Sequence, residues 1–267
     1  MKLSLVVPLL NQHELTRACF NRIKENAIEE VEYIFIDNGS DVPFEMKGVK
    51  VIRNEKGTGV YPTFKQGFDV ATGDVVAFLH SDVVIWEKGW DKRIVEEFEK
   101  DRNLGMIGFV GSSEIDYMGG RGLGTASNFM GRTLDKWTGS PAEVHGKRIT
   151  NAMPSCVVDG CVMIIRRQAW NEIGVKGNFP PHHFYDRLIS TQLIEKNWKI
   201  ITLGIEFDHF NGQTVSNENK YHTMAEEWAS ANNIPFCEGW DNTIYKEAER
   251  RWLKEYRDEK HLIPIKV

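Results

Sequence analysis

The stretch Gly73–Asp82, GDVVAFLHSD, carries the strongest local signal for the fold of this chain. A continuous apolar run, Val75 to Leu79, lies between the turn formers Gly73-Asp74 and the polar triplet His80-Ser81-Asp82. Such a run between turn signals is typical of a strand that is buried on both faces of a parallel sheet. The triplet would then stand at the carboxyl end of the strand, where open α/β sheets bind their ligands.

Upstream of this stretch, short strands alternate with amphipathic helices. Leu3–Val7 and Val31–Ile36 are apolar runs, Val49–Arg53 is a weaker one, and apolar residues at helical spacing separate them. Asn11 is expected to cap the first helix, with Glu14 three residues later as in a capping box. Short alternating elements predict βαβ units and a mostly parallel sheet with helices on both faces.

The second half of the sequence is less regular. Between Gly111 and Gly146 glycines are frequent and periodicity is weak, which is typical of functional loops. The elements expected after it are a strand at Cys161–Ile165, helices at Arg167–Ile173 and Tyr185–Lys196, a strand at Lys199–Leu203, a polar loop over 207–218 and a charged helix over Asn242–Lys260.

Composition places the chain among ordinary globular proteins. It has 267 residues, 41% of them hydrophobic and 27% charged, with a net charge of −5. These values exclude disordered, collagen-like and disulfide-scaffold classes. The acidic balance argues against a protein that coats nucleic acid, because phosphate contacts need clustered Lys and Arg.

Cysteines and hydropathy bear on the compartment. The four cysteines have neither CxxC nor zinc-finger spacing, so we expect free thiols in a reducing environment. No stretch approaches the ~20 apolar residues of a membrane span, and the N-terminal apolar run is too short for a signal peptide. We therefore expect a cytoplasmic location. Peripheral membrane contact through the C-terminal helix is given little weight, since its charge is mixed.

Two acids follow predicted strands, Asp37 after VEYIFI and Asp82 after VVAFL. A carboxylate at that place accepts hydrogen bonds from a base or ribose, or holds a divalent cation together with phosphate oxygens. The alternative for either residue alone is a turn former or helix cap, which is the commonest role of Asp after a strand.

Taken together and in order, several segments resemble an inverting family 2 glycosyltransferase with the GT-A fold. The segments are SLVVPLLNQ, FIDNGSD, RNEKGTGVYPTFKQGFDVATGDVVAFLHSDV, VVDGCVMIIRRQAWNEIG, HHFYDRLISTQLIEKNWKI and FDHFNGQT. The resemblance covers about residues 1 to 215. It implies a Rossmann-like mixed sheet, mostly parallel and flanked by helices, with a C-terminal helical extension.

The domain boundaries expected on this basis follow the same segments. A single GT-A domain would span residues 1–215, with a nucleotide-binding half at 1–110 and an acceptor half at 111–215. Residues 216–267 would form a loop and helix extension that packs on the same domain.

The resemblance also implies roles for individual residues. A divalent cation, Mn²⁺ or Mg²⁺, would be bound by Asp82 with help from His209, and Asp186 would be the catalytic base. Asp37 would accept the N–H of the base, uracil or thymine in most relatives, while Lys65 is either a phosphate contact or a solvated lysine. The residues implied to bind the nucleotide sugar are Pro8, Asn11, Asp37, Asn38, Ser40, Gly57, Gly59, Lys65, His80 and Ser81.

The sequence departs from the family pattern at two places near these residues. The metal triplet keeps only its last acid, Asp82, where relatives often have two or three acids. The Glu that precedes the base in the family is Tyr185 here, and the acid two residues after the base is Leu188.

The implied reaction is metal-dependent transfer from a nucleoside-diphosphate sugar of the UDP or dTDP type, with inversion, to a hydroxyl acceptor. The cation would neutralise the leaving diphosphate and the base would take the acceptor proton. The acceptor stays open between a glycan, a lipid-linked sugar, a protein and a modified nucleobase. We expect Asp37, Asp82 and Asp186 to converge around a single pocket that holds the diphosphate.

Two rival functions remain. A sugar-phosphate nucleotidylyltransferase shares a nucleotide-binding α/β half but opens with a Gly-rich, Arg-bearing loop, where this chain has PLLNQHE. A non-catalytic nucleotide-sugar-binding module would explain the reduced triplet, although Asp82, Asp186 and His209 are all present.

Overall fold

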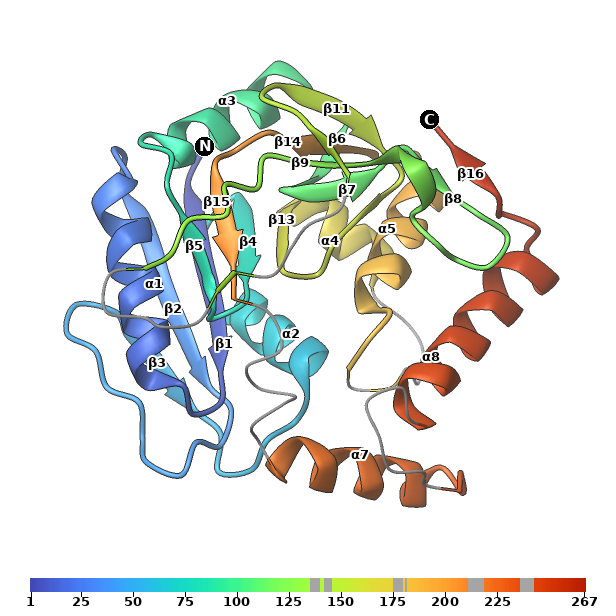
Figure 1. Ribbon diagram of the computed structural model, residues 1–267, viewed down its shortest axis with the longest axis horizontal. Coiled ribbons are helices and arrows are strands. Elements are labelled where there is room, and N and C mark those ends of the chain that lie inside the picture. The colour runs from blue at the N-terminus through green and yellow to red at the C-terminus, as the bar shows by residue number, and fades with distance from the viewer. Residues whose placement is uncertain (135–139, 142–145, 175–179, 181, 211–218, 236–242) are drawn as a thin grey trace.

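A computed structural model describes residues 1–134, 140–141, 146–174, 180, 182–210, 219–235 and 243–267 of the chain, and a large sheet runs through its centre (Figure 1). The strands of this sheet are β1 (Leu3–Leu9), β2 (Val31–Asp37), β3 (Lys50–Arg53), β4 (Val75–Leu79), β6 (Leu104–Gly108), β11 (Ala152–Ser155), β13 (Val162–Arg166) and β14 (Lys199–Leu203).

The order of the strands is β11-β14-β6-β13-β4-β1-β2-β3. Parallel pairings join β1 to β2 and β4, β2 to β3, and β6 to β14. β13 is antiparallel to both β4 and β6, and β11 is antiparallel to β14. The mostly parallel, mixed sheet predicted from the alternating pattern is therefore confirmed.

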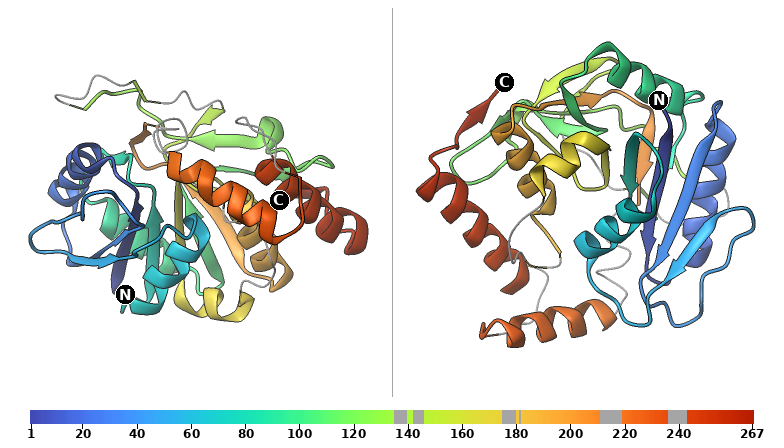
Figure 2. Two further views of the ribbon diagram at one scale, coloured as in Figure 1. Left: turned by 90° about the horizontal axis from the view of Figure 1, so that it is seen from below. Right: turned by 180° about the vertical axis from the view of Figure 1, so that it is seen from behind.

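Helices cover both faces of the sheet, as Figure 2 shows from behind. On β1, Leu3, Leu5 and Val7 belong to one core, whereas Val6 belongs to the other, because successive side chains point to opposite faces. The first core contains α1 (His13–Asn26) and α3 (Trp90–Lys100), and the second contains α2 (Val60–Val70), α4 (Arg167–Ile173) and α5 (Tyr185–Glu195).

Pro8 limits the pairing between β1 and β4. The carbonyl of Leu9 accepts the N–H of Asn38 and so faces β2, which turns the backbone of Pro8 toward β4. The β4 ladder stops at Val6, before the residue that has no N–H to offer. The carboxyl ends of β1 and β4 are therefore not bonded to each other.

The predicted capping box at Asn11 is wrong. Asn11 and Gln12 both have φ of 53°, and the N-cap position is Gln12, without a side-chain cap. The side chain of Asn11 instead pairs with Asp41: its Oδ1 accepts the N–H of Asp41 at 2.9 Å and its Nδ2 donates to the carboxylate at 3.2 Å. A long-range partner thus outcompetes the local cap.

A two-stranded pairing of β5 (Val83–Ile85) with β15 (Phe207–His209) corrects a second expectation, since residues 207–209 were predicted as loop. The strands are antiparallel, with His209 opposite Val83 and Phe207 opposite Ile85. Such a short strand has no periodic signal of its own and forms only because β5 is there to pair with it.

Asp208 fastens this pairing to the neighbouring loop. It is fully buried, and its carboxylate accepts the N–H groups of Met130, Gly131 and Arg132 at 2.7–3.1 Å and the indole N–H of Trp86 at 2.7 Å. Charge-assisted bonds of this kind are about twice as strong as neutral ones. They hold β15 in place beside the β4–β5 turn.

Smaller sheets extend the body on the side of β6. One has the order β10-β9-β7-β12, and β8 pairs with β16 near the C-terminus. The strands are β7 (Val110–Ser112), β8 (Glu114–Ile115), β9 (Thr125–Ser127), β10 (Lys147–Arg148), β12 (Val157–Val158) and β16 (Ile265–Lys266). A short 3-10 helix, η1 (Gly122–Gly124), precedes β9.

The C-terminal residues carry α7 (Asn219–Ala231), α8 (Thr243–Leu253) and η2 (Lys254–Glu259), which lie at the periphery in Figure 1. Trp252 and Tyr256 are fully buried against Phe184 and Leu188 of the α5 region. The expected domain boundary near residue 215 lies outside the described residues, so it stays a prediction.

Two further expectations concern thiols and membranes. Cys19, Cys156 and Cys161 are free and buried, while Cys237 lies outside the described residues. Among the helices that the structure describes, none combines the length and apolarity that crossing a bilayer requires.

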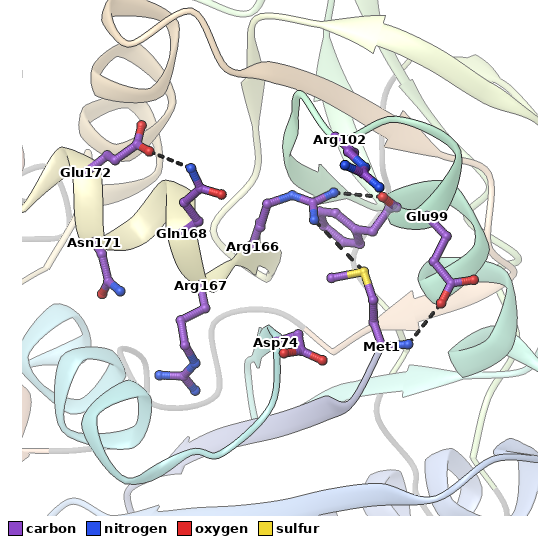
Figure 3. Close-up of a pocket in the computed structure, with 10 residues that line it drawn as sticks. Met1, Asp74, Glu99, Arg102, Arg166, Arg167, Gln168, Asn171 and Glu172 are labelled. Atoms are coloured by element: carbon purple, nitrogen blue, oxygen red, sulfur yellow. Dashed lines mark hydrogen bonds and ion pairs between the residues drawn. The ribbon is translucent and has the colours of Figure 1, made fainter.

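A cavity of about 840 Å³ opens at the amino edge of the sheet, beside Met1 and Asp74 (Figure 3). Arg166 reaches from the end of β13 and donates to three backbone carbonyls, those of Phe98, Asp101 and Leu104, at 2.7–3.0 Å. This guanidinium thus satisfies the carboxyl-terminal carbonyls of α3 and the start of β6, which is a structural role.

We predict that Arg166→Met lowers the free energy of unfolding by about 2–4 kcal/mol, because it leaves these carbonyls without their charged donor. Arg102→Met is the control, since Arg102 is exposed and lines the same cavity; it should change stability by less than about 0.5 kcal/mol. Urea unfolding of both variants measures the difference, and equal effects would contradict the structural role.

Candidate functional site

The polar triplet lies in the turn between β4 and β5, at the carboxyl edge of the sheet. His80 donates its backbone N–H to the carbonyl of Cys161 at 3.0 Å, and its own carbonyl accepts the N–H of Val83 at 3.2 Å. These bonds fix the turn on both sides. Asp82 is 8% exposed and His80 is partly buried.

Asp82 and His209 meet because of the β5–β15 register. His209 stands opposite Val83, the residue after Asp82, and its Nε2 lies 3.1 Å from Asp82 Oδ1. His80 completes the group: ligand atoms of the three residues all lie within 4.8 Å of one another. The His80 and His209 rings are 5.5 Å apart, edge to face.

The negative charge of Asp82 in this cluster is offset by its neighbour His209. Burial alone would raise the pKa of Asp82, but the neighbouring His209 and His80 hold it below its ordinary value. Burial would lower the pKa of His209, yet Asp82 raises it above its usual value. The pKa of His80 is lowered, by burial first and by His209 second. Asp82 is therefore ionised at neutral pH.

The donor set fits a divalent cation. His209 Nε2 is buried and, among the described residues, has no hydrogen-bond partner of good geometry, although Asp82 lies within ion-pair distance. A buried imidazole nitrogen without a hydrogen bond is costly unless another ligand occupies it. One carboxylate and two imidazoles are acceptable ligands for Mn²⁺ or another divalent metal that tolerates mixed N and O donors.

Asp186 lies in the first turn of α5, directly after Tyr185, and Tyr185 contacts the cluster. The hydroxyl of Tyr185 is 2.8 Å from His80 Nε2, and the Asp186 carboxylate accepts the N–H of Arg187 at 2.8 Å. Asp82 and Asp186 both raise the pKa of His80, so both carboxylates lie within electrostatic reach of that ring. Asp186 is partly buried and so retains access to solvent.

Asp159 and Arg121 belong to the same cluster and were missed from the sequence. They form an ion pair, and Asp159 also accepts the N–H of Cys161 at 3.0 Å. Burial alone would raise the pKa of Asp159, but Arg121 holds it well below the ordinary value. Asp159 and then Asp186 are the carboxylates that raise the pKa of Arg121. A polar Asp-Gly inside the strand-like run VVDGCV was the available signal.

The other predicted residues form a second group around the turn after β2. The Asn11 N–H donates to Ser40 Oγ at 2.8 Å, which ties the end of β1 to this turn. Asn38 Oδ1 accepts the N–H of Thr58 at 3.0 Å, which ties it in turn to the loop before α2. The loops after β1, after β2 and before α2 are thus one hydrogen-bonded unit.

Asp37 organises this unit from inside. It is fully buried, its Oδ1 accepts the N–H of Ser40 at 2.9 Å, and its Oδ2 accepts from Phe44 at 3.0 Å and from Arg53 at 2.6 Å. Burial alone would raise the pKa of Asp37, but these donors hold it below its ordinary value. In this conformation the carboxylate offers no exposed surface to a base, and its assignment to base binding stays a prediction.

Glycines bring the loops into close contact. A Cβ on Gly57 would lie 3.0 Å from the carbonyl of Asn38 and 3.1 Å from Met224 Sδ, so α7 approaches the loop as well. Gly59 has φ of 86° and begins α2. Lys65 is 57% exposed and its Nζ lies 2.6 Å from Asp69, which agrees with the solvated alternative.

All three acids that were expected to converge lie on the carboxyl side of the sheet. Asp37 ends β2 and Asp82 follows β4, with β1 between these strands. Neighbouring strands lie about 4.8 Å apart, so β2 and β4 are separated laterally by roughly 10 Å. Asp82 and Asp186 are close enough to act on one histidine, whereas Asp37 sits apart among its own donors.

Comparison with known proteins gives a consistent picture. The sequence model of the family described as glycosyl transferase family 2 matches residues 4–172. An uncharacterized glycosyltransferase of Nostoc sp. is 29% identical over 118 residues, which is 40% of this chain and 36% of the relative. A PGL/p-HBAD biosynthesis glycosyltransferase of Mycobacterium bovis is 27% identical over 93 residues, 32% of this chain and 36% of the relative. The chain thus aligns with about a third of the length of these curated relatives.

Solved structures share the fold at low identity. A mannosyltransferase of Pyrobaculum calidifontis, in complex with GDP-Man and Mn²⁺, has a TM-score of 0.54 at 12% identity and covers 95% of this chain and 69% of its own. S. aureus TarS 1–349, in complex with UDP-GlcNAc, has a TM-score of 0.54 at 14% identity and covers 99% and 74%. The fold is that of the GT-A glycosyltransferases.

The contacts of Asp37 predict its effect on stability. Asp37→Asn should lower the free energy of unfolding at pH 7 by about 2–4 kcal/mol, because Arg53 loses its charged partner. Since the folded-state pKa of Asp37 is lowered, this stabilisation is present above the unfolded pKa near 4 and is lost as the pH falls below it. Urea unfolding from pH 7 to 3 should show wild type and variant converging.

Asp69→Asn is the matched control, because its carboxylate forms an exposed pair with Lys65. It should change stability by less than about 1 kcal/mol at any pH. The structural role would be contradicted if Asp37→Asn were as stable as wild type and differed from it only in weaker binding of uridine nucleotides. That result would favour base recognition.

Proposed function

We propose, from the premise that this chain belongs to glycosyl transferase family 2, that it transfers a sugar from a nucleoside-diphosphate sugar to a hydroxyl acceptor with inversion. The observation that carries the proposal is the group His80, Asp82 and His209 at the carboxyl edge of the sheet, with Asp186 within electrostatic reach of His80. Ligands of open α/β sheets bind at this edge.

Asp82, His209 and His80 would hold the divalent cation. A cation bound there supplies positive charge that offsets the negative charge developing on the leaving diphosphate. The lowered pKa of Asp82 supports this assignment, as does the buried Nε2 of His209, which contacts Asp82 at 3.1 Å without good hydrogen-bond geometry. Arg121 and Asp159 form an ion pair in the same region, so Asp159 adds no uncompensated negative charge beside the diphosphate.

Asp186 would be the general base. A carboxylate that remains partly solvent-accessible in the first turn of a helix accepts the proton of an acceptor hydroxyl as the new bond forms. One base and one direct displacement invert the anomeric carbon without a covalent intermediate. His80 and Tyr185 connect this carboxylate to the cation-binding turn.

The donor would lie along the edge of the sheet, with its diphosphate at Asp82 and its base near the loops tied by Asn11, Asn38 and Ser40. The lateral separation of β2 and β4, roughly 10 Å for two strand spacings, would suit a nucleotide that lies extended along the edge. The solved neighbours bind GDP-Man in one case and UDP-GlcNAc in the other. We propose a UDP- or dTDP-sugar for this chain.

The acceptor side is formed by the loops that follow β6. We propose that the acceptor approaches Asp186 from the segment between Gly111 and Asn151, part of which lies outside the described residues. The acceptor would be a hydroxyl carrier: a glycan, a lipid-linked sugar, a protein or a modified nucleobase.

A thermal-shift panel tests the donor and the metal. Uridine, deoxythymidine and guanosine diphosphate sugars are added with and without Mn²⁺, and we expect the uridine or deoxythymidine compounds to raise the melting temperature only with Mn²⁺. Binding stabilises the folded state in proportion to the logarithm of ligand excess over Kd. A guanosine compound that works equally well would reject the base assignment, and no shift with any donor would reject the function.

Asp186→Asn tests the base. We expect donor binding in the thermal-shift assay to be kept and transfer or slow donor hydrolysis to fall by about 10²- to 10⁴-fold, the usual contribution of a general base. Glu195→Gln, at the other end of the same helix, is the control and should leave the rate within about twofold. Undiminished turnover in Asp186→Asn would remove this residue from the base role.

A further inference from the structure

We infer that Tyr185 is a positioning residue of the cation site: its hydroxyl fixes the ring of His80 so that His80 can act as the third protein ligand beside Asp82 and His209. The inference rests on the proposed function and names an additional residue for it. It concerns a hydroxyl with no metal contact of its own, which acts through the imidazole.

The contacts of His80 define its orientation. Nε2 lies 2.8 Å from the Tyr185 hydroxyl, and the ring stacks on Phe64 with centroids 6.4 Å apart. On another side it meets the His209 ring edge to face at 5.5 Å. The Nε2 atom is thus engaged by Tyr185, which leaves Nδ1 as the ring nitrogen available to a cation.

Tyr185 is itself held rigidly, so it can orient its partner. Its side chain is 8% exposed and packs edge to face on Phe64, with centroids 5.7 Å apart. Gly160 lies against the phenol, since a Cβ at that position would collide with the ring and its hydroxyl. This packing restricts the phenol ring and directs its hydroxyl to His80.

The chemistry of imidazole then gives the hydrogen bond a direction. A neutral histidine has one nitrogen that donates and one that accepts. If Nδ1 gives its lone pair to a cation, Nε2 carries the proton and donates it to the Tyr185 oxygen. Metal-bound histidines nearly always donate their second N–H in this way, and removal of the acceptor typically weakens metal binding by about 10- to 100-fold.

His80 and Tyr185 both replace acidic residues of the family pattern, and these two replacements are compatible with each other. They stand at two of the positions where the sequence departs from the acidic family pattern, and the structure places them in direct contact. A neutral histidine and a phenol form a hydrogen bond there, whereas two carboxylates would repel each other. Because Tyr185 immediately precedes Asp186, the same bond anchors the first turn of α5 beside the cation site.

The test measures Mn²⁺ binding directly, by electron paramagnetic resonance titration without donor or acceptor. The proteins are wild type, Tyr185→Phe, His80→Ala and the double variant. We expect Tyr185→Phe to raise the Kd for Mn²⁺ by about 10-fold and His80→Ala by at least as much. The double variant should match His80→Ala, because Tyr185 acts only through that ring.

Tyr61→Phe is the matched control, since it also removes one phenol hydroxyl from a residue that packs in the second core. It should leave the Kd for Mn²⁺ unchanged. The melting temperature of each variant without metal shows whether a change in affinity reflects the site or the whole fold.

Three outcomes would overturn the inference. If Tyr185→Phe binds Mn²⁺ as wild type does while His80→Ala does not, Tyr185 has no positioning role, although the proposed function survives. If the two losses add in the double variant, Tyr185 acts by another route. If wild type binds no Mn²⁺ and yet is stabilised by nucleotide sugars, the cation site itself is wrong, and the inference falls with the metal dependence.

Discussion

The site depends on one short antiparallel pairing, that of β15 with β5. Its register places His209 opposite Val83 and so brings the imidazole to within 3.1 Å of the Asp82 carboxylate. A pairing of only a few residues is weak by itself. Asp208 compensates, because its fully buried carboxylate accepts four donors from Trp86 and residues 130–132 and locks β15 to the loop beyond it.

The two ends of the carboxyl edge are built on different principles. Around Asp37 every carboxylate oxygen has protein donors, and the loops after β1 and β2 are bonded to each other and to the start of α2. This end is a rigid, satisfied frame. Around Asp82 the opposite holds: among the described residues, the buried Nε2 of His209 has only Asp82 within ion-pair distance and no hydrogen bond of good geometry. The end whose buried ligand atoms are not fully hydrogen-bonded, and whose pKa values are perturbed, is the one expected to take a ligand.

Charge around Asp82 is distributed so that each acid has a distinct environment. Asp159 is neutralised by Arg121, Asp82 is stabilised by His209, and Asp186 stays partly accessible at the start of α5. Three carboxylates of equal environment would raise one another's pKa. The separate partners hold the pKa values of Asp82 and Asp159 below their ordinary values, although both side chains are buried. The mixed character of the sheet contributes, because antiparallel β13 begins beside the β4–β5 turn and brings Asp159 to it.

The sequence by itself determined the strands and helices whose pattern is local and repetitive. These are the strands at Leu3, Val31 and Val75, the helix predicted over Tyr185–Lys196 and found over Tyr185–Glu195, and the mostly parallel sheet. The ordered segments also predicted the family, which the match over residues 4–172 confirms. Site roles for Asp82, Asp186 and His209 were predicted from the same segments, and these roles stay predictions. Tertiary structure alone decided the partners. Asn11 pairs with Asp41 rather than capping its helix, residues 207–209 form a strand, Arg121 meets Asp159, and Tyr185 meets His80. Each of these joins residues distant in the chain, and such contacts have no periodicity for a sequence to display, because they exist only once the sheet has brought its carboxyl ends together.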